Sequence, residues 1–177
     1  AKRPDIDRWI ISELNHLIKE VEKAFDKYDA TKAAREISTF VNDLLSNWYV
    51  RLSRRRFWKG VLSDDKLSAY HTLFECLDKV CRLMAPLAPF FAERLFLDLN
   101  KENKLELKDS VHLTIFPTSN PEHRDIELEN KMNYARDISS LALSIRKKNQ
   151  VKVRQPLSKL IVPVKSILEK KSIESVS

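Results

Sequence analysis

Glycine is almost absent from this sequence: Gly60 is the only one among 177 residues. Loops that cradle a nucleotide phosphate need several glycines, because their backbone comes close to the ligand or takes a positive φ. No such fingerprint can be assembled from this chain. We therefore expect neither a nucleotide pocket nor a bound cofactor in these residues.

Cysteine is scarce as well, and Cys76 and Cys81 lie five positions apart in an apolar helical pattern. A structural zinc site usually needs four ligands at short paired spacings, whereas the four histidines of this chain are scattered. Two buried free thiols and no metal are the better interpretation. The histidines also form no pair with a nucleophile, so we expect a chain that binds rather than catalyses.

Long apolar runs are missing too. No stretch could span a bilayer, and Ala1–Pro4 is not followed by the apolar core of a signal peptide. We expect a cytoplasmic protein with no membrane partner. Because Ala1–Lys2 and Ser175–Ser177 do not look like a natural start and finish, we also expect a piece of something larger.

Apolar residues recur at steps of three and four, which is the pattern of amphipathic helices. The pattern predicts helices over Pro4–Tyr28, Ala30–Trp58, Ser63–Met84, Phe90–Asn100 and Asp125–Asn149. Asp29 and Ser63 can cap two of them, and Gly60 can end one. Long helices with short connections predict a mainly α fold, an antiparallel helical bundle.

Two segments depart from the helical pattern. Val111–Pro117 alternates and is rich in β-branched residues, so we expect it to be extended, as an edge strand or as a strap across the bundle. Leu157–Pro163 is predicted to be a small strand, and Val164–Ser177 is only weakly determined. The residues expected to be mostly buried are Trp9, Phe25, Phe40, Leu44, Trp48, Phe74 and Leu77.

One short stretch stands out by its charge. Asn47–Gly60 holds five cations, four aromatic residues and no acid. At ~100° per residue, Trp48 and Leu52 should face the core, with the cations beside the apolar stripe. The candidate RNA-binding residues here are Arg51, Arg54, Arg55, Arg56, Trp58 and Lys59.

Such a run needs an explanation outside the fold. One or two cations would complement the dipole at a helix C-terminus, whereas five without an acid repel one another. Arginine outnumbers lysine four to one, and its planar fork suits phosphate and stacks on bases. RNA or another polyanion is therefore favoured over a solvated helix end, which stays the alternative. Modest further support comes from a second basic cluster: Arg146, Lys147, Lys148, Lys152 and Arg154.

Several motifs together resemble a known family. They are DRWIISEL from Asp7, NWYVR from Asn47, RRRFW from Arg54, APFFAE from Ala88, SVHL from Ser110 and KVRQPL from Lys152. In this order they are similar to the helical anticodon-binding domain of the isoleucyl-tRNA synthetases, which are class I enzymes. The resemblance covers Pro4 to Val162.

The resemblance implies a bundle that contacts the anticodon stem and loop of an isoleucine tRNA. It also implies a longer enzyme that ligates isoleucine to this tRNA with ATP and magnesium, and it leaves zinc in that enzyme open. Residues 1–156 would be the anticodon-binding bundle, packed with the catalytic domain of the same chain, and 157–177 the start of a junction to a further domain.

The sequence departs from the whole family enzyme in what it omits. Neither HIGH nor KMSKS, the ATP-site motifs of the class, occurs here, so no catalytic or editing site is expected in this chain. A helical protein–protein interaction module remains the main rival. It would need a contiguous exposed apolar patch, whereas RNA binding needs a basic one.

Overall fold

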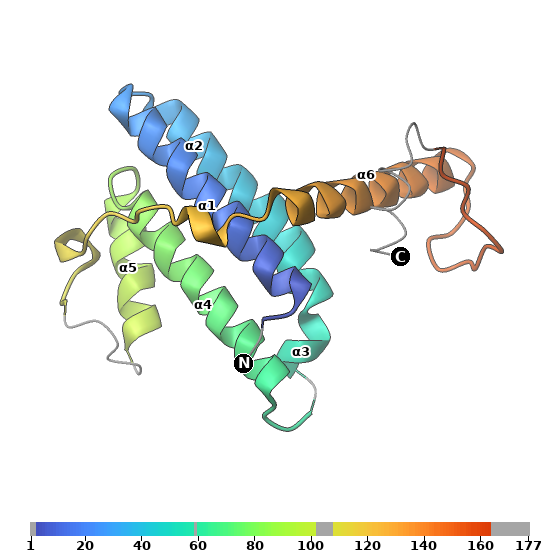
Figure 1. The fold of residues 1–177 in the computed structure, drawn as a ribbon, viewed down its shortest axis with the longest axis horizontal. Coiled ribbons are helices and arrows are strands. Elements are labelled where there is room, and N and C mark those ends of the chain that lie inside the picture. Colours follow the sequence, from blue (N-terminus) through green and yellow to red (C-terminus); the bar gives the residue numbers. More distant parts are fainter. Residues whose placement is uncertain (1–2, 59, 102–107, 164–177) are drawn as a thin grey trace. The chain divides into compact units, whose positions relative to one another are not determined.

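The computed structural model describes residues 3–58, 60–101 and 108–163. The chain divides into two compact units, Ala1–Asp125 and Ile126–Ser177 (Figure 1). The predicted boundary after residue 156 lies inside the second unit. That boundary, which the family resemblance implies, stays a prediction.

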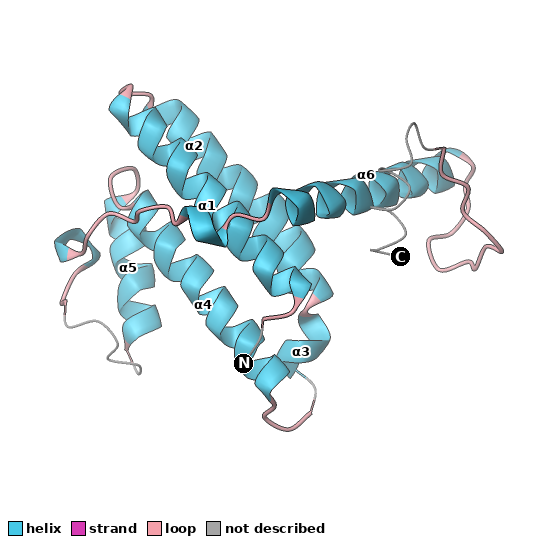
Figure 2. Ribbon diagram, viewed as in Figure 1, coloured by secondary structure: helices cyan, strands magenta, loops and turns pink. Residues whose placement is uncertain are grey.

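The described residues are mainly helical and contain no strand (Figure 2). The strand predicted for Leu157–Pro163 is therefore wrong. An alternating apolar segment becomes a strand only when another backbone pairs with it, and the described residues offer none. None of the helices in the described part is both long and apolar enough to cross a membrane.

Helix α1, Asp5–Asp26, begins after Pro4 and carries two carboxylates in its first turn, where they face the positive end of the helix dipole. Its apolar face is the centre of the first unit, with Trp9, Ile10, Leu14 and Val21 almost fully buried. Helix α2, Ala30–Thr39, follows a tight turn. Asp29 caps it as predicted, by accepting a 2.8 Å hydrogen bond from the backbone N–H of Lys32.

The predicted single helix Ala30–Trp58 is interrupted. After α2 the chain forms a π-helix, η1, over Phe40–Val50, turns at Ser53 and ends in the short helix α3, Arg54–Trp58. A π-helix closes its hydrogen bonds one residue later than an α-helix. The buried positions of this segment are accordingly spaced by five and then four residues: Phe40, Leu45, Tyr49, Ser53 and Phe57.

This register shift corrects the predicted core. Tyr49, not Trp48, is fully buried, and Leu52, predicted to face the core, is 54% exposed. Among the other residues expected in the core, Trp9 and Phe40 are buried. The remaining five lie only partly buried: Phe25, Leu44, Trp48, Phe74 and Leu77.

Helix α4, Asp64–Met84, is capped by Ser63 as predicted, and α5, Pro89–Asn100, begins at a proline. Their facing surfaces share a core formed by Cys81, Ala85, Ala92, Phe96 and Val111. Both cysteines are free and buried, which confirms the prediction. Burial raises the pKa of the Cys81 thiol to about 11.

The segment after α5 crosses the first unit as a strap, and in Figure 1 it runs in yellow and gold past α1. The prediction of an extended segment over Val111–Pro117 is wrong for its first three residues, which form the 3-10 helix η2, Val111–Leu113. A second 3-10 helix, η3, Pro121–His123, follows, and the backbone at both ends of each is extended. Two polar side chains of α1 hold it: Asn15 accepts from the N–H of Asn120 and Ser12 from that of Asp125, both at 2.7 Å. The second unit contains α6, Ile126–Lys148.

Candidate nucleic-acid interface

The basic end of the first unit is built around one buried carboxylate. Asp7, in the first turn of α1, is fully buried. Arg56 of α3 reaches it with both terminal nitrogens, Nη1 to Oδ1 at 2.6 Å and Nη2 to Oδ2 at 2.9 Å. The Tyr49 hydroxyl also donates to Oδ1, at 3.0 Å, and the Ser68 hydroxyl to Oδ2, at 2.7 Å. Each oxygen thus accepts two hydrogen bonds.

These contacts decide the ionisation of the site. Burial raises the pKa of the Asp7 carboxyl, but hydrogen bonds from Arg56, Ser68 and Tyr49 outweigh it, so this pKa lies below its usual value. The hydrogen bond to Asp7 raises the pKa of Arg56 despite partial burial. Burial and the nearby Asp7 charge raise the pKa of Tyr49 well above its usual range. At neutral pH the cluster is therefore a carboxylate, a guanidinium and a neutral phenol.

Arg56 does not lie on the exposed surface proposed for RNA. Its side chain is only 16% exposed and also contacts Asp65, with Nη2 lying 2.8 Å from Oδ1. The bidentate pair with Asp7 holds Arg56 inwards and neutralises its charge within the fold. Lys59, another candidate, lies outside the described residues.

Three other arginines of the run face solvent. Within the described residues, no carboxylate pairs with Arg51, Arg54 or Arg55. Trp58, which is 70% exposed, carries the Arg54 guanidinium 4.4 Å from its ring centroid. A guanidinium on an indole face is a cation–π contact. It places the charge of Arg54 and the ring of Trp58 next to each other on α3. Arg51, Arg54, Arg55 and Trp58 are thus all exposed, and their grouping into one RNA-binding surface stays a prediction.

Aromatic side chains pack against the buried side of α3, around Phe57. The Phe57 ring lies edge-to-face between two tyrosines, with its centroid 6.5 Å from that of Tyr49 and 5.3 Å from that of Tyr70. The Tyr70 hydroxyl donates to the Phe57 carbonyl at 3.1 Å. Beyond α3, Gly60 takes a φ of +82°, a conformation that favours glycine.

The second basic cluster belongs to the second unit and shows a similar division. Arg146 is turned towards its own chain, where Nη1 donates to the carbonyl oxygens of Lys152 and Gln155, both at 2.9 Å. Lys147, Lys148, Lys152 and Arg154 are exposed. In this part of the described chain no carboxylate pairs with these four.

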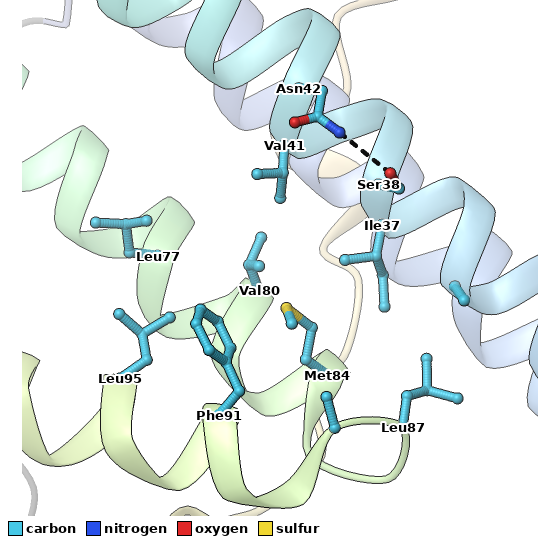
Figure 3. A pocket seen from close by; sticks show the side chains of 12 residues that line it. Ile37, Ser38, Val41, Asn42, Leu77, Val80, Met84, Leu87, Phe91 and Leu95 are labelled. Carbon is cyan, nitrogen blue, oxygen red and sulfur yellow. Dashed lines mark hydrogen bonds between the residues drawn. The ribbon is translucent and has the colours of Figure 1, made fainter.

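A different surface of the first unit is apolar. A groove of about 620 Å³ lies between α2, η1, α4 and α5. Figure 3 shows Ile37 and Val41 on one side facing Val80, Met84 and Phe91 on the other. The only polar side chains lining it are Ser38 and Asn42, which are hydrogen-bonded to each other at 3.1 Å. A groove of this kind suits an apolar protein segment rather than RNA.

Sequence patterns did not reveal the Asp7 cluster. Asp7 follows Pro4 and Asp5, and acids at that place have a sufficient explanation in the helix dipole. The available signal in the sequence was an acid among apolar neighbours, Ile6, Trp9 and Ile10. No group of three or more potential metal ligands occurs in the described chain. The absence of metal and nucleotide sites stays a prediction.

Comparison with known proteins supplies the family. Residues 7–161 match the family described as the anticodon-binding domain of tRNA ligase. The chain is 52% identical over 176 residues to the isoleucine–tRNA ligase of Bacteroides thetaiotaomicron, covering 99% of this chain and 15% of that protein. It is 40% identical over 173 residues to the isoleucine–tRNA ligase of Thermus thermophilus, covering 98% of this chain and 17% of that protein.

The chain thus spans about 15% of the length of the curated relatives that it matches. The family match, in contrast, extends over most of the chain, from the Asp7 cluster and the exposed arginines to the segment after α6. This chain belongs to the family of anticodon-binding domains of tRNA ligases.

Proposed function

We propose that this chain binds the anticodon stem and loop of an isoleucine tRNA. The observation that carries the proposal is a set of arginines without a carboxylate partner in the described chain. They are Arg51, which precedes the turn at Ser53, and Arg54 and Arg55, which lie with Trp58 on the short helix that Arg56 ties to Asp7. Guanidinium groups contact phosphates in bidentate fashion, and an exposed indole stacks on an unpaired base. The anticodon arm offers both, a charged stem and a loop with splayed bases.

The isoleucine part of the proposal is supported by the names of the relatives, which are isoleucine–tRNA ligases. The longer protein would ligate isoleucine to its tRNA with ATP and magnesium in the cytoplasm. These residues would supply the grip on the RNA, because HIGH and KMSKS are not among them.

Lys147, Lys148, Lys152 and Arg154 of the second unit are proposed as a separate set of RNA contacts, and Lys59 is retained from the sequence. Arg56 is assigned a different role, inside the fold. The apolar groove favours an additional protein contact, and the catalytic domain of the same longer chain is the occupant that the family membership suggests.

The test compares RNA fragments. Wild-type protein and the double variant R54A/R55A would be titrated with whole isoleucine tRNA, with its anticodon-arm hairpin and with its acceptor-arm hairpin. We expect the double variant to bind whole tRNA and the anticodon hairpin at least tenfold more weakly, with no change for the acceptor hairpin. Arg35→Ala, an exposed arginine of α2 outside the basic run, is the matched control. Equal weakening for both hairpins, or none, would contradict the proposal.

A further inference from the structure

We propose that Asp7 is a positioning residue for RNA binding: it holds Arg56 and so fixes the direction in which Arg54, Arg55 and Trp58 project. The inference rests on the proposed function and adds a buried residue of α1 to it. Asp7 itself is fully buried and would touch no RNA.

The first reason is the size of α3. It contains five residues, Arg54–Trp58, and follows a turn at Ser53. Isolated helices of this length are not stable, because nucleation costs more than one turn of hydrogen bonds returns. Backbone hydrogen bonds through Ser53 join α3 to the preceding segment, and the side chains that face inwards, Arg56 and Phe57, add its contacts with the rest of the first unit.

The second reason is that the Phe57 contacts alone do not define a direction. Apolar contacts tolerate small rotations, whereas two parallel guanidinium–carboxylate hydrogen bonds fix both a distance and a plane. Arg56 supplies that pair at 2.6 and 2.9 Å, and its Nε adds a 3.0 Å hydrogen bond to Asp65. The guanidinium thus ties α3 to α1 and to the first turn of α4.

The third reason is that Asp7 is held from several elements. Its partners lie 42, 49 and 61 residues away in the sequence: Tyr49 in η1, Arg56 in α3 and Ser68 in α4. The carboxylate accepts four hydrogen bonds from these three residues, two of them from Arg56. An asparagine would place an NH₂ group against at least one of the donors, so the substitution disturbs the anchor without changing the size of the side chain.

A role in stability alone would not need this arrangement. Buried ion pairs are weak sources of stability compared with apolar residues of the same volume, and their best-attested use is to specify one arrangement. Here the arrangement decides where the exposed cations point, since Arg54 and Arg55 directly precede Arg56 in the sequence. Rotating α3 by one residue would bring a different arginine to Asp7.

The experiment separates positioning from folding. In the full-length protein, Asp7→Asn would be compared with Asp78→Asn, which disrupts another nearly buried pair: Arg82–Asp78 at 3.0 Å, with side chains 11% and 12% exposed. Association with isoleucine tRNA is followed against potassium chloride for protein shown to be folded by circular dichroism. We expect Asp7→Asn to weaken binding about tenfold and to flatten the log–log salt slope by about 0.7–0.9 for each phosphate that the protein no longer binds. Asp78→Asn should leave both values unchanged.

A double-mutant cycle supplies the decisive outcome. If Asp7 acts through the neighbouring arginines, the loss from Asp7→Asn and the loss from R54A/R55A should overlap, so that the combined variant binds little worse than R54A/R55A. The inference is overturned if the two losses in affinity multiply in the combined variant. It is also overturned if Asp7→Asn keeps the affinity and salt slope of wild type while R54A/R55A binds weakly. Either result leaves the proposed function standing. Wild-type affinity for R54A/R55A overturns the proposed function itself.

Arg56→Lys covers the case in which Asp7→Asn does not fold. It preserves the charge but loses the second parallel hydrogen bond. We expect the same flattened slope and the same overlap with R54A/R55A. Unchanged binding by Arg56→Lys would count against the inference.

Discussion

Asp7 and Arg56 are joined by two parallel hydrogen bonds, Nη1 to Oδ1 at 2.6 Å and Nη2 to Oδ2 at 2.9 Å, across 49 positions of the sequence. This pair removes one of the five cations of Asn47–Gly60 from the surface. It also connects the first turn of α1 to the helix that carries the exposed arginines. A single carboxylate thus affects both the stability of the first unit and the geometry of its basic end.

The pair predicts how stability depends on pH. The pKa of Asp7 in the folded state lies below its usual value of 3.8, so its contribution is fully present above that value and is lost as the pH falls through the folded-state pKa. The difference in unfolding free energy between wild type and Asp7→Asn should be constant from pH 7 to about 5 and shrink below pH 4. Urea unfolding at several pH values measures it. A difference that grows on acidification would contradict this account.

Tyr49→Phe isolates one hydrogen bond of the cluster. It removes a hydroxyl that donates to Asp7 at 3.0 Å and lies 3.3 Å from the Ala69 carbonyl, while the buried ring is kept. We expect a loss of about 1–2 kcal/mol in unfolding free energy. Tyr70→Phe, which removes a hydrogen bond at a half-exposed ring, is the matched control and should cost less. Equal losses would show that burial around Tyr49 does not matter.

The π-helix η1 predicts an asymmetry between two deletions. Removing exposed Ser46 takes one residue from a segment that has one too many for α-helical spacing, so Tyr49, Ser53 and Phe57 can stay buried. Removing exposed His16 from α1 rotates everything after it by ~100°. In thermal unfolding, the Ser46 deletion should show a cooperative transition, with an unfolding free energy within about 1 kcal/mol of that of wild type. The His16 deletion should show no cooperative transition. Two equally disrupted proteins would contradict the register argument.

Arg146→Ala should release the chain that follows α6. Its guanidinium bridges the carbonyl oxygens of Lys152 and Gln155, and exposed backbone without such contacts opens more often. Trypsin should cleave after Lys152 and Arg154 several-fold faster in this variant. Lys147→Ala, which changes an exposed cation of the same turn of α6, is the control and should leave these cleavage rates unchanged. The products can be identified by mass.

Local signals in the sequence predicted most of the helices. Asp29 and Ser63 each mark a helix start by satisfying an unpaired backbone N–H, and the structure has helices at both places. Asn15 and Ser12 show the limit of such signals. They are polar residues on the buried face of α1, and their partners lie more than 100 residues away, at Asn120 and Asp125.

The register of Phe40–Trp58 was not predictable from a period of 3.6 residues. Trp48 and Leu52 are large and apolar, so a regular helix would bury them, whereas the π-helix selects Tyr49 and Ser53. The hydroxyl of Tyr49 reaches Asp7 only when Tyr49 faces inwards, and this hydrogen bond favours the shifted register. Such a preference arises from tertiary contacts, and no window of local sequence contains it.

Arg51, Arg54 and Arg55 are proposed to bind phosphates of the tRNA anticodon arm. The affinity of the full-length protein for isoleucine tRNA should therefore be measured against potassium chloride concentration, with each arginine replaced by alanine in turn. Each replacement should flatten the log–log slope by about 0.7–0.9, equally for matched and altered anticodons, while Arg35→Ala should leave the slope of wild type. If affinity and slope stay unchanged in all three variants with the fold intact, the basic run is a solvated helix end and the account is wrong.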